Sequence, residues 1–188
     1  MRDFIEDYFN RLKSTVDNMD REEIEKFVHL LLKAEKNEQT IFTMGNGGSG
    51  STASHFIGDI AKGIKGKNFK VICLNDSFPI LMAYANDMSY DDIFVEQLKP
   101  FFKKGDVVIG FSTSGNSRNI IKAIEFANEN GGETVGFTGY DGGKLKQIAK
   151  YSINANINEV QVSEDVHLAV VHMIMQFINK QDKDNGVF

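Results

Sequence analysis

Four ionisable residues on two expected helices could carry chemistry. His55 and Asp59 stand four residues apart in one helix, and Glu164 and His172 stand eight apart in another. At 3.6 residues per turn, His55 and Asp59 project from one helix face, about one turn apart. A histidine and a carboxylate placed in this way can hold a divalent metal or work as an acid and base pair. A simple hydrogen bond on the surface is the alternative interpretation.

His172 lies in an almost wholly apolar stretch, residues 166–178. Ionisable groups in such surroundings are paired or line a cavity, so we expect His172 to be functional. Eight helical residues rise about 12 Å, so a metal shared by Glu164 and His172 requires Glu164 to lean back from the helix start. His29, among apolar helix residues, is assigned to packing.

Residues 112–117 read Ser-Thr-Ser-Gly-Asn-Ser and join an apolar strand to a helix. A strand that turns through hydroxyls and glycine into a helix N-terminus presents backbone N–H groups, side-chain donors and the positive end of the helix dipole. The loop lacks the lysine of a Walker loop and the G-x-G-x-x-G of a dinucleotide turn. We therefore expect a phosphate monoester on a small molecule, the alternative being a plain helix cap and turn.

A second loop, residues 43–55, repeats this design after another strand. Its four glycines let the backbone approach a ligand closely, and Asn46 and Ser49 are among its donors. Two such loops at the carboxyl ends of parallel strands would flank one crevice, the usual ligand position in an open α/β sheet.

Apolar periodicity predicts an N-terminal helical hairpin over residues 1–36, an α/β core over 37–180 and a polar, frayed tail over 181–188. Strands are expected at 40–44, 69–74, 107–111, 133–137 and 151–155, and helices at 51–62, 78–86, 91–99, 117–129, 143–149 and 160–180. This alternation predicts a five-stranded parallel sheet covered by helices on both faces. The hairpin is more helix than the sheet needs, which favours an oligomer.

The composition bounds the class of protein. With 188 residues and 41% hydrophobic content, the chain suits one domain. A net charge of −5 argues against nucleic acid as a partner, and no apolar run approaches the 18 residues of a membrane span. The single cysteine, Cys73, is expected to be buried. It can form no disulfide within the chain, and the acidic N-terminus does not fit a signal peptide, so we predict a cytoplasmic protein.

Several ordered motifs carry a resemblance to a known family. They are Gly45-Asn-Gly-Gly-Ser49 with His55, Ala85-Asn-Asp87, Ser112-Thr-Ser-Gly-Asn-Ser117, Thr138-Gly-Tyr-Asp-Gly-Gly143, and Glu164 with His172. In this order and spacing they resemble the sugar isomerase (SIS) domain proteins, and most of all the bacterial phosphoheptose isomerases. The resemblance extends from the N-terminal hairpin to about residue 180.

The resemblance implies a flavodoxin-like fold, a homotetramer and interconversion of a 2-ketose phosphate, most of all sedoheptulose 7-phosphate, with its aldose isomer. It assigns contacts with the phosphorylated sugar to Asn46, Gly47, Ser49, Asn86, Asp87, Ser112, Thr113, Ser114 and Ser117. It assigns catalysis to Asp59, His172 and Glu164, and a zinc site to His55, Asp59, Glu164 and His172.

The chain departs from the resembled pattern at two of these positions. Asp59 stands where those isomerases carry a glutamate that serves as base and metal ligand, and Glu164 stands where they carry a glutamine. Asp59 is shorter by about 1.5 Å of reach, enough to matter for a positioned base. Glu164 adds a negative charge, which favours a divalent cation. We expect a carboxylate, Asp59 or Glu164, to act as the base that forms an enediol, and His172 to act as the acid.

Two rival functions stay open on the sequence. One is an isomerase for a different sugar phosphate. The other is a non-catalytic SIS protein, either a sugar-phosphate sensor or a tetrameric adaptor that binds a replication initiator. The presence together of His55, Asp59, Glu164 and His172 favours an enzyme.

Overall fold

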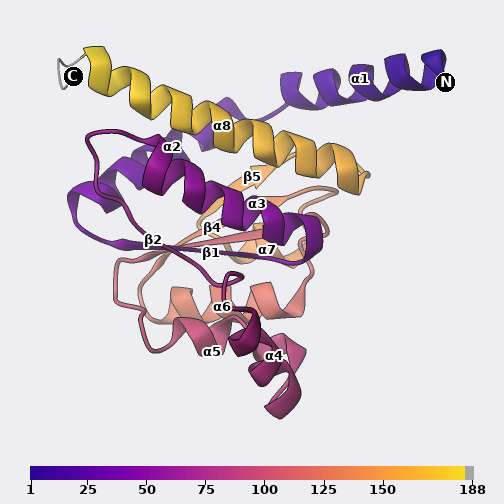
Figure 1. Cartoon of the computed structure of the whole chain (residues 1–188). Helices are drawn as coiled ribbons and strands as arrows, with labels where there is room; N and C mark the ends of the chain where they lie inside the picture. The colour runs from indigo at the N-terminus through magenta and orange to yellow at the C-terminus, as the bar shows by residue number, and fades with distance from the viewer. Residues whose placement is uncertain (185–188) are drawn as a thin grey trace.

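A five-stranded parallel sheet in the order β2-β1-β3-β4-β5 forms the centre of the molecule. The computed structural model describes residues 1–184, with side chains as far as Gln181. The strands are β1 (Thr40–Gly45), β2 (Lys70–Cys73), β3 (Val107–Ser112), β4 (Glu133–Thr138) and β5 (Tyr151–Asn154). Figure 1 shows helices on both faces of this sheet, which confirms the α/β class and the flavodoxin-like strand order expected from the sequence.

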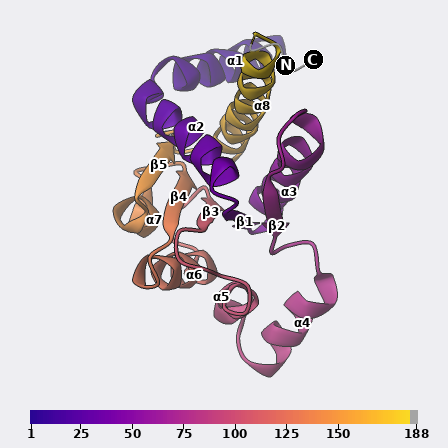
Figure 2. The same ribbon diagram turned by 90° about the vertical axis from the view of Figure 1, so that its left-hand side faces the viewer.

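Alternate strand residues point to opposite faces and so feed two cores. Ile41 and Ile109 pack with the helices of one face, whereas Phe42 and Val108 pack with those of the other. The first face carries α2 (Arg21–Lys36), α3 (Gly47–Gly58) and α8 (Val160–Asp184). The second carries α5 (Val95–Leu98), α6 (Arg118–Glu129) and α7 (Gly143–Ile148). Figure 2 shows these two layers edge on.

Two helices stand apart from the sheet. The first, α1 (Arg2–Asp17), lies along α8, where the Tyr8 hydroxyl donates to Asp165 at 2.6 Å. The second, α4 (Phe78–Asp87), hangs below the sheet in Figure 1, and none of its residues is buried. A short 3₁₀ turn, Tyr90–Asp92, follows it. Both helices expose large apolar side chains. For α1 this agrees with the expectation that the N-terminal hairpin is more helix than the sheet needs.

Local sequence explains several helix boundaries. Asp20 caps α2 by accepting a hydrogen bond from the Glu23 N–H at 3.1 Å. Pro79 lies in the first turn of α4, where its missing N–H costs nothing. Cys73 is buried, as expected, and burial raises the pKa of its thiol to about 11.

The third helix differs from the prediction for residues 51–62. It begins four residues earlier, at Gly47, and changes at Asp59 into a π-helical turn, Asp59–Gly63. Asn179 of α8 donates to the Gly63 carbonyl and accepts from the Lys65 N–H, so this turn is fastened to α8. A π turn widens the backbone ring by one residue and is frequent at functional sites.

Two further expectations were wrong. His29 is exposed and not packed in the core; it lines an open pocket with Met173 and Phe177 of α8. The tail expected from residue 181 is helical as far as Asp184, and residues 185–188 lie outside the described part of the chain.

One buried histidine links α8 to the sheet. His167 is 1% exposed, and its Nε2 lies 3.0 Å from the Thr138 carbonyl oxygen, to which it donates. Its ring also packs edge-on against Phe137. Burial lowers the pKa of His167 to about 4.

We expect this histidine to make the fold acid-sensitive. As pH falls below about 6.5 the unfolded chain takes up the proton first, so stability present above that pH is lost as pH falls towards 4. The full shift corresponds to about 3 kcal/mol, of which about 2 kcal/mol should be lost between pH 7.5 and pH 5. Urea unfolding at fixed protein concentration, at pH 7.5 and pH 5, measures it. His167→Gln keeps a donor for Thr138 and should flatten the difference, whereas an equal pH dependence in both proteins would contradict the assignment.

Candidate functional site

The serine loop after β3 presents hydroxyl protons to one point. Ser112 Oγ donates to Ser117 Oγ at 3.1 Å, and the Asn116 N–H donates to Ser114 Oγ at 3.2 Å. Ser114 and Ser117 thus accept from the protein and keep their own protons for a ligand. Ser117 is also the N-cap of α6, yet its side chain makes no capping hydrogen bond. The first-turn N–H groups and the helix dipole add to the anion-binding character of the loop.

The glycine-rich loop after β1 is held rigidly beside it. The Asn75 side chain accepts from the Gly45 N–H at 3.0 Å and donates to the Gly45 carbonyl at 2.7 Å. A Cβ on Gly45 would lie 2.4 Å from the backbone of Ser49, so only glycine lets α3 start this close to its strand. Gly47 has φ +54°, a left-handed conformation that favours glycine.

A cavity of about 190 Å³ lies between the two loops. It is lined by Asn46, Ser49, Phe111, Ser112, Thr113, Ser114, Ser117, Val160 and Glu164. Glu164 reaches it from the first turns of α8 and fills the space beside Gly48, where an added Cβ would be 2.5 Å from its Oε2. Ser49 Oγ lies 3.4 Å from Glu164 Oε1.

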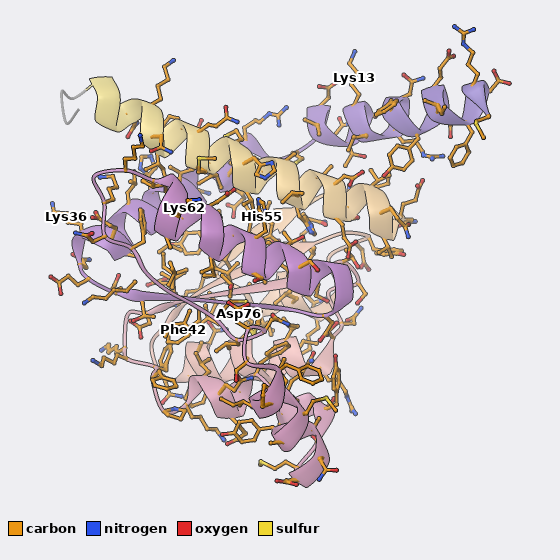
Figure 3. All side chains as sticks on the ribbon, in the orientation of Figure 1. Lys13, Lys36, Phe42, His55, Lys62 and Asp76 are labelled. Carbon is orange, nitrogen blue, oxygen red and sulfur yellow. The ribbon has the colours of Figure 1, made fainter. Side chains whose placement is uncertain are left out.

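A second cluster lies further along the same two helices. His55 of α3 and His172 of α8 face each other with 2.8 Å between their Nε2 atoms. Asp59, at the start of the π turn, places Oδ2 3.4 Å from His55 Nε2 and 3.8 Å from His172 Nε2. Figure 3 labels His55 on α3, on the side towards α8. The i,i+4 spacing on α3 therefore brought His55 and Asp59 together, as predicted.

The donor set of this cluster fits a divalent metal. Asp59 Oδ2 is buried and has no hydrogen-bond partner, and the three ligand atoms lie within 4.8 Å of one another. Ligands of tetrahedral zinc, at about 2.0–2.1 Å from the ion, are about 3.3 Å apart, and two imidazoles with one carboxylate are a common zinc set. A bound ion would give this buried carboxylate oxygen the partner that it lacks, and the two imidazole nitrogens that face it would be the other ligands.

The structure thus brings together most, but not all, of the predicted site residues. Glu164 does not join the histidine cluster; its carboxylate lies at the serine-loop cavity. Asn86 and Asp87 lie at the exposed end of α4, bonded to each other at 2.8 Å, and do not line that cavity. Gly47 lines a neighbouring apolar cleft of about 320 Å³.

Three polar residues around the glycine-rich loop were missed by the sequence analysis. Asn75 stands two residues after the end of β2, and a polar residue just beyond a parallel strand could have pointed to it. Asn119 and Tyr90 both hydrogen-bond to Asn46, and no local signal marks them.

Comparison with known proteins agrees with this arrangement. The family model described as SIS domain matches residues 4–139. A probable phosphoheptose isomerase of Thermoplasma acidophilum is 34% identical over 87% of this chain and 91% of its own. A phosphoheptose isomerase of Helicobacter pylori is 33% identical over 90% of this chain and 88% of its own. The solved structure of phosphoheptose isomerase from Neisseria gonorrhoeae superposes with a TM-score of 0.88 at 27% identity, covering 95% of this chain and 98% of that one.

The fold and the two hydroxyl-rich loops therefore define a sugar-phosphate isomerase of the SIS class. Within that class, the chain belongs to the family of the phosphoheptose isomerases.

We expect the serine loop to supply much of the affinity for a phosphorylated sugar. Replacing Ser114 and Ser117 together by alanine removes two donors to a charged acceptor, each worth about 1.5–3 kcal/mol. Calorimetric titration with sedoheptulose 7-phosphate should show binding weakened at least about 100-fold, with the fold intact by circular dichroism. Ser54→Ala, which removes a hydroxyl bonded to Asp76 outside the cavity, is the matched control. Unchanged affinity in the double variant would remove the phosphate assignment.

Proposed function

We propose that this protein interconverts sedoheptulose 7-phosphate and the corresponding aldose, glycero-manno-heptose 7-phosphate, through an enediol. The observation that carries the proposal is the combination of an anion-binding serine loop, at the start of α6, with a His–Asp–His cluster further along α3 and α8. The loop suits the phosphate, and the cluster suits the carbonyl end of the sugar. The names of the relatives given above support the same substrate.

The separation of the two groups favours a long sugar. Glu164, beside the serine loop, and His172, in the cluster, are eight residues apart on α8, a rise of about 12 Å. Gly48 and His55 are seven residues apart on α3, which gives about 10 Å in the same direction. A substrate with its phosphate on the loop needs an extended carbon chain to bring C1 and C2 to the histidines. A triose phosphate is too short for this.

We assign the proton transfer between C1 and C2 to Asp59. Its Oδ2 faces the two histidines and is buried, but 18% of the side chain is exposed, and that exposure lies on its other atoms. The second oxygen can thus remove a proton from C1 of the ketose and return it to C2. Glu164 is the less suitable base, because its carboxylate lies at the phosphate end of the site.

The residues His55, Asp59 and His172 would hold the zinc ion that the resemblance implies. An ion bound there would supply a Lewis acid that stabilises negative charge on the substrate oxygens. Nε2 of His172 cannot carry a proton while it binds a metal, so the metal role for His172 replaces the expected role as an acid. An active protein without metal would restore the acid role.

The non-catalytic alternative is not favoured. A sensor or adaptor needs the serine loop but has no use for a carboxylate oxygen held between two imidazoles. The single buried cysteine is in keeping with a reducing compartment, and we assign the protein to the cytoplasm. None of the described helices is long and apolar enough to cross a membrane.

Isomerisation of sedoheptulose 7-phosphate tests the function and the base together. In deuterated water the wild type should convert the sugar and incorporate deuterium at C1 or C2. Asp59→Asn should lower kcat by about 10²–10⁴-fold, the usual contribution of a positioned base, whereas Glu164→Gln should retain activity within about tenfold. No conversion by the wild type would refute the function; the reverse order of the two variants would make Glu164 the base.

The zinc content of the purified wild type and variants tests the proposed metal site. We expect about one zinc per chain in the wild type and in Glu164→Gln, and loss of zinc and activity in His55→Ala. Full activity after chelation would contradict the zinc site.

We also infer a homotetramer. Two separate apolar surfaces lie open on the described chain, one on α4 and one on the first turns of α1. The exposed side chains are Phe78, Ile80, Met82 and Met88 on α4, and Phe4, Ile5 and Phe9 on α1. A tetramer of dihedral symmetry needs at least two different self-complementary surfaces, and we assign these two to that role.

Light scattering should give four times the chain mass of 21.1 kDa at micromolar concentration. Phe78→Ser with Met82→Ser, and separately Phe4→Ser with Phe9→Ser, should each remove one interface and leave dimers. Because these side chains are exposed in the single chain, the variants should still fold. A wild type of monomeric mass would rule the tetramer out.

A further inference from the structure

Asn46 of the glycine-rich loop is part of a polar network that the function described above does not use. Its Nδ2 donates to Asn119 Oδ1 at 3.0 Å, and its Oδ1 accepts from Asn119 Nδ2 at 2.9 Å. The Tyr90 hydroxyl donates to the same Oδ1 at 2.8 Å. Asn119 belongs to the first turn of α6 and is 2% exposed, so this amide pair ties the glycine-rich loop to the helix that follows the serine loop.

A fourth hydrogen bond fixes which way both amides point. The backbone N–H of Ile120 donates to Asn119 Oδ1 at 2.9 Å, and a backbone N–H can only donate. Turning Asn119 over would place its NH₂ group against this N–H. Turning Asn46 over alone would set oxygen against oxygen and NH₂ against NH₂. Only the observed arrangement satisfies all four contacts, so the orientation follows from the hydrogen bonds.

The network also diverts Asn46 from its local role. Asn46 is the N-cap of α3, a position where an asparagine side chain ordinarily accepts from the first-turn N–H groups, worth about 1 kcal/mol. Here its side chain makes no capping bond and turns to Asn119 instead. An asparagine that makes a distant contact in place of a stabilising local one departs from the local rule, which indicates a role other than helix capping.

One N–H group of the Asn46 side chain takes no part in this network. The carbonyl of Asn46 accepts two hydrogen bonds, and one of its two N–H groups is used. The other N–H has no partner among the contacts of the described chain. Asn46 lines both the apolar cleft beside Tyr90 and the cavity that the serine loop also lines, and only the second has polar groups suited to a phosphorylated sugar. The amide therefore offers this cavity a donor whose direction is fixed before a ligand arrives.

We propose that Asn119 and Tyr90 are positioning residues that lock Asn46 as a hydrogen-bond donor to an oxygen of the phosphorylated substrate. This proposal rests on the proposed function. Asn119 and Tyr90 act only through Asn46, and neither is a catalytic residue. Without them the amide can rotate, and its carbonyl can then face the substrate oxygens and repel them.

A double-mutant cycle tests this dependence. Asn119→Ala should lower kcat/KM for sedoheptulose 7-phosphate about tenfold, mainly through KM, as expected for one misdirected hydrogen bond. Tyr90→Phe should lower it about threefold. In an Asn46→Ala background each change should alter kcat/KM by less than about twofold, because the group that they position is gone. Equal losses in both backgrounds would overturn the proposal.

Controls separate positioning from folding. Thermal unfolding reports whether Asn119→Ala folds; if it does not, the Tyr90→Phe cycle decides, since Tyr90 is 57% exposed. Tyr151→Phe removes a hydroxyl at the start of β5, far from the two loops in the sequence, and should leave kcat/KM unchanged.

The two hypotheses can fail separately. A wild type that binds the sugar phosphate without isomerising it would refute the function, and the same cycle is then measured on the calorimetric Kd. A wild type that isomerises it while the cycle is additive would refute the positioning role alone. A wild type that does neither would overturn both.

Discussion

The register between β1 and β3 is the constraint on which the site depends. Gly45, the last residue of β1, pairs with Phe111, so β1 ends beside the penultimate residue of β3, and the two loops leave the sheet at Asn46 and, after Ser112, at Thr113. Because the strands are parallel, both segments leave the sheet at the same edge; α3 begins at Gly47, two residues after β1, and α6 begins at Arg118, after the serine loop. Two helix N-termini, with their free N–H groups, thus lie at the same edge of the sheet.

The close approach of α3 and α8 provides the second half of the site. Small residues on α3 and on the π turn after it make this approach possible. Gly48 leaves the space that the Glu164 carboxylate occupies, and a Cβ on Gly63 would lie 3.3 Å from Met175. Because Gly63 has no side chain, the π turn can pack closely against α8 at this position. The short Asp59 side chain starts this turn, so the backbone change and the shortened carboxylate occur at the same residue.

The sequence predicted the parts that depend on local pattern. Alternating strands and helices predicted the sheet, and the hydroxyl and glycine residues at two strand ends predicted the loops, because turn chemistry is written into neighbouring residues. The π turn was not predicted from the sequence, because a 3.6-residue pattern does not distinguish α from π backbone over one turn. The exposure of His29 was not predicted either, for a related reason. Apolar neighbours on both sides in sequence do not say which face of the helix the histidine takes.

The partners of Asn46 lay beyond prediction because they are chosen by tertiary structure. Asn119 is 73 residues away, and Tyr90 comes from a turn next to a helix that barely touches the sheet. Their pairing nevertheless follows the same logic as Asn75 at Gly45, where one side-chain amide satisfies a backbone donor and acceptor together. Asn75 ties the loop to β2, and Asn119 ties it to α6. A loop rich in glycine is intrinsically mobile, so amide pairs on its two sides are what convert its freedom to approach a ligand into one defined geometry.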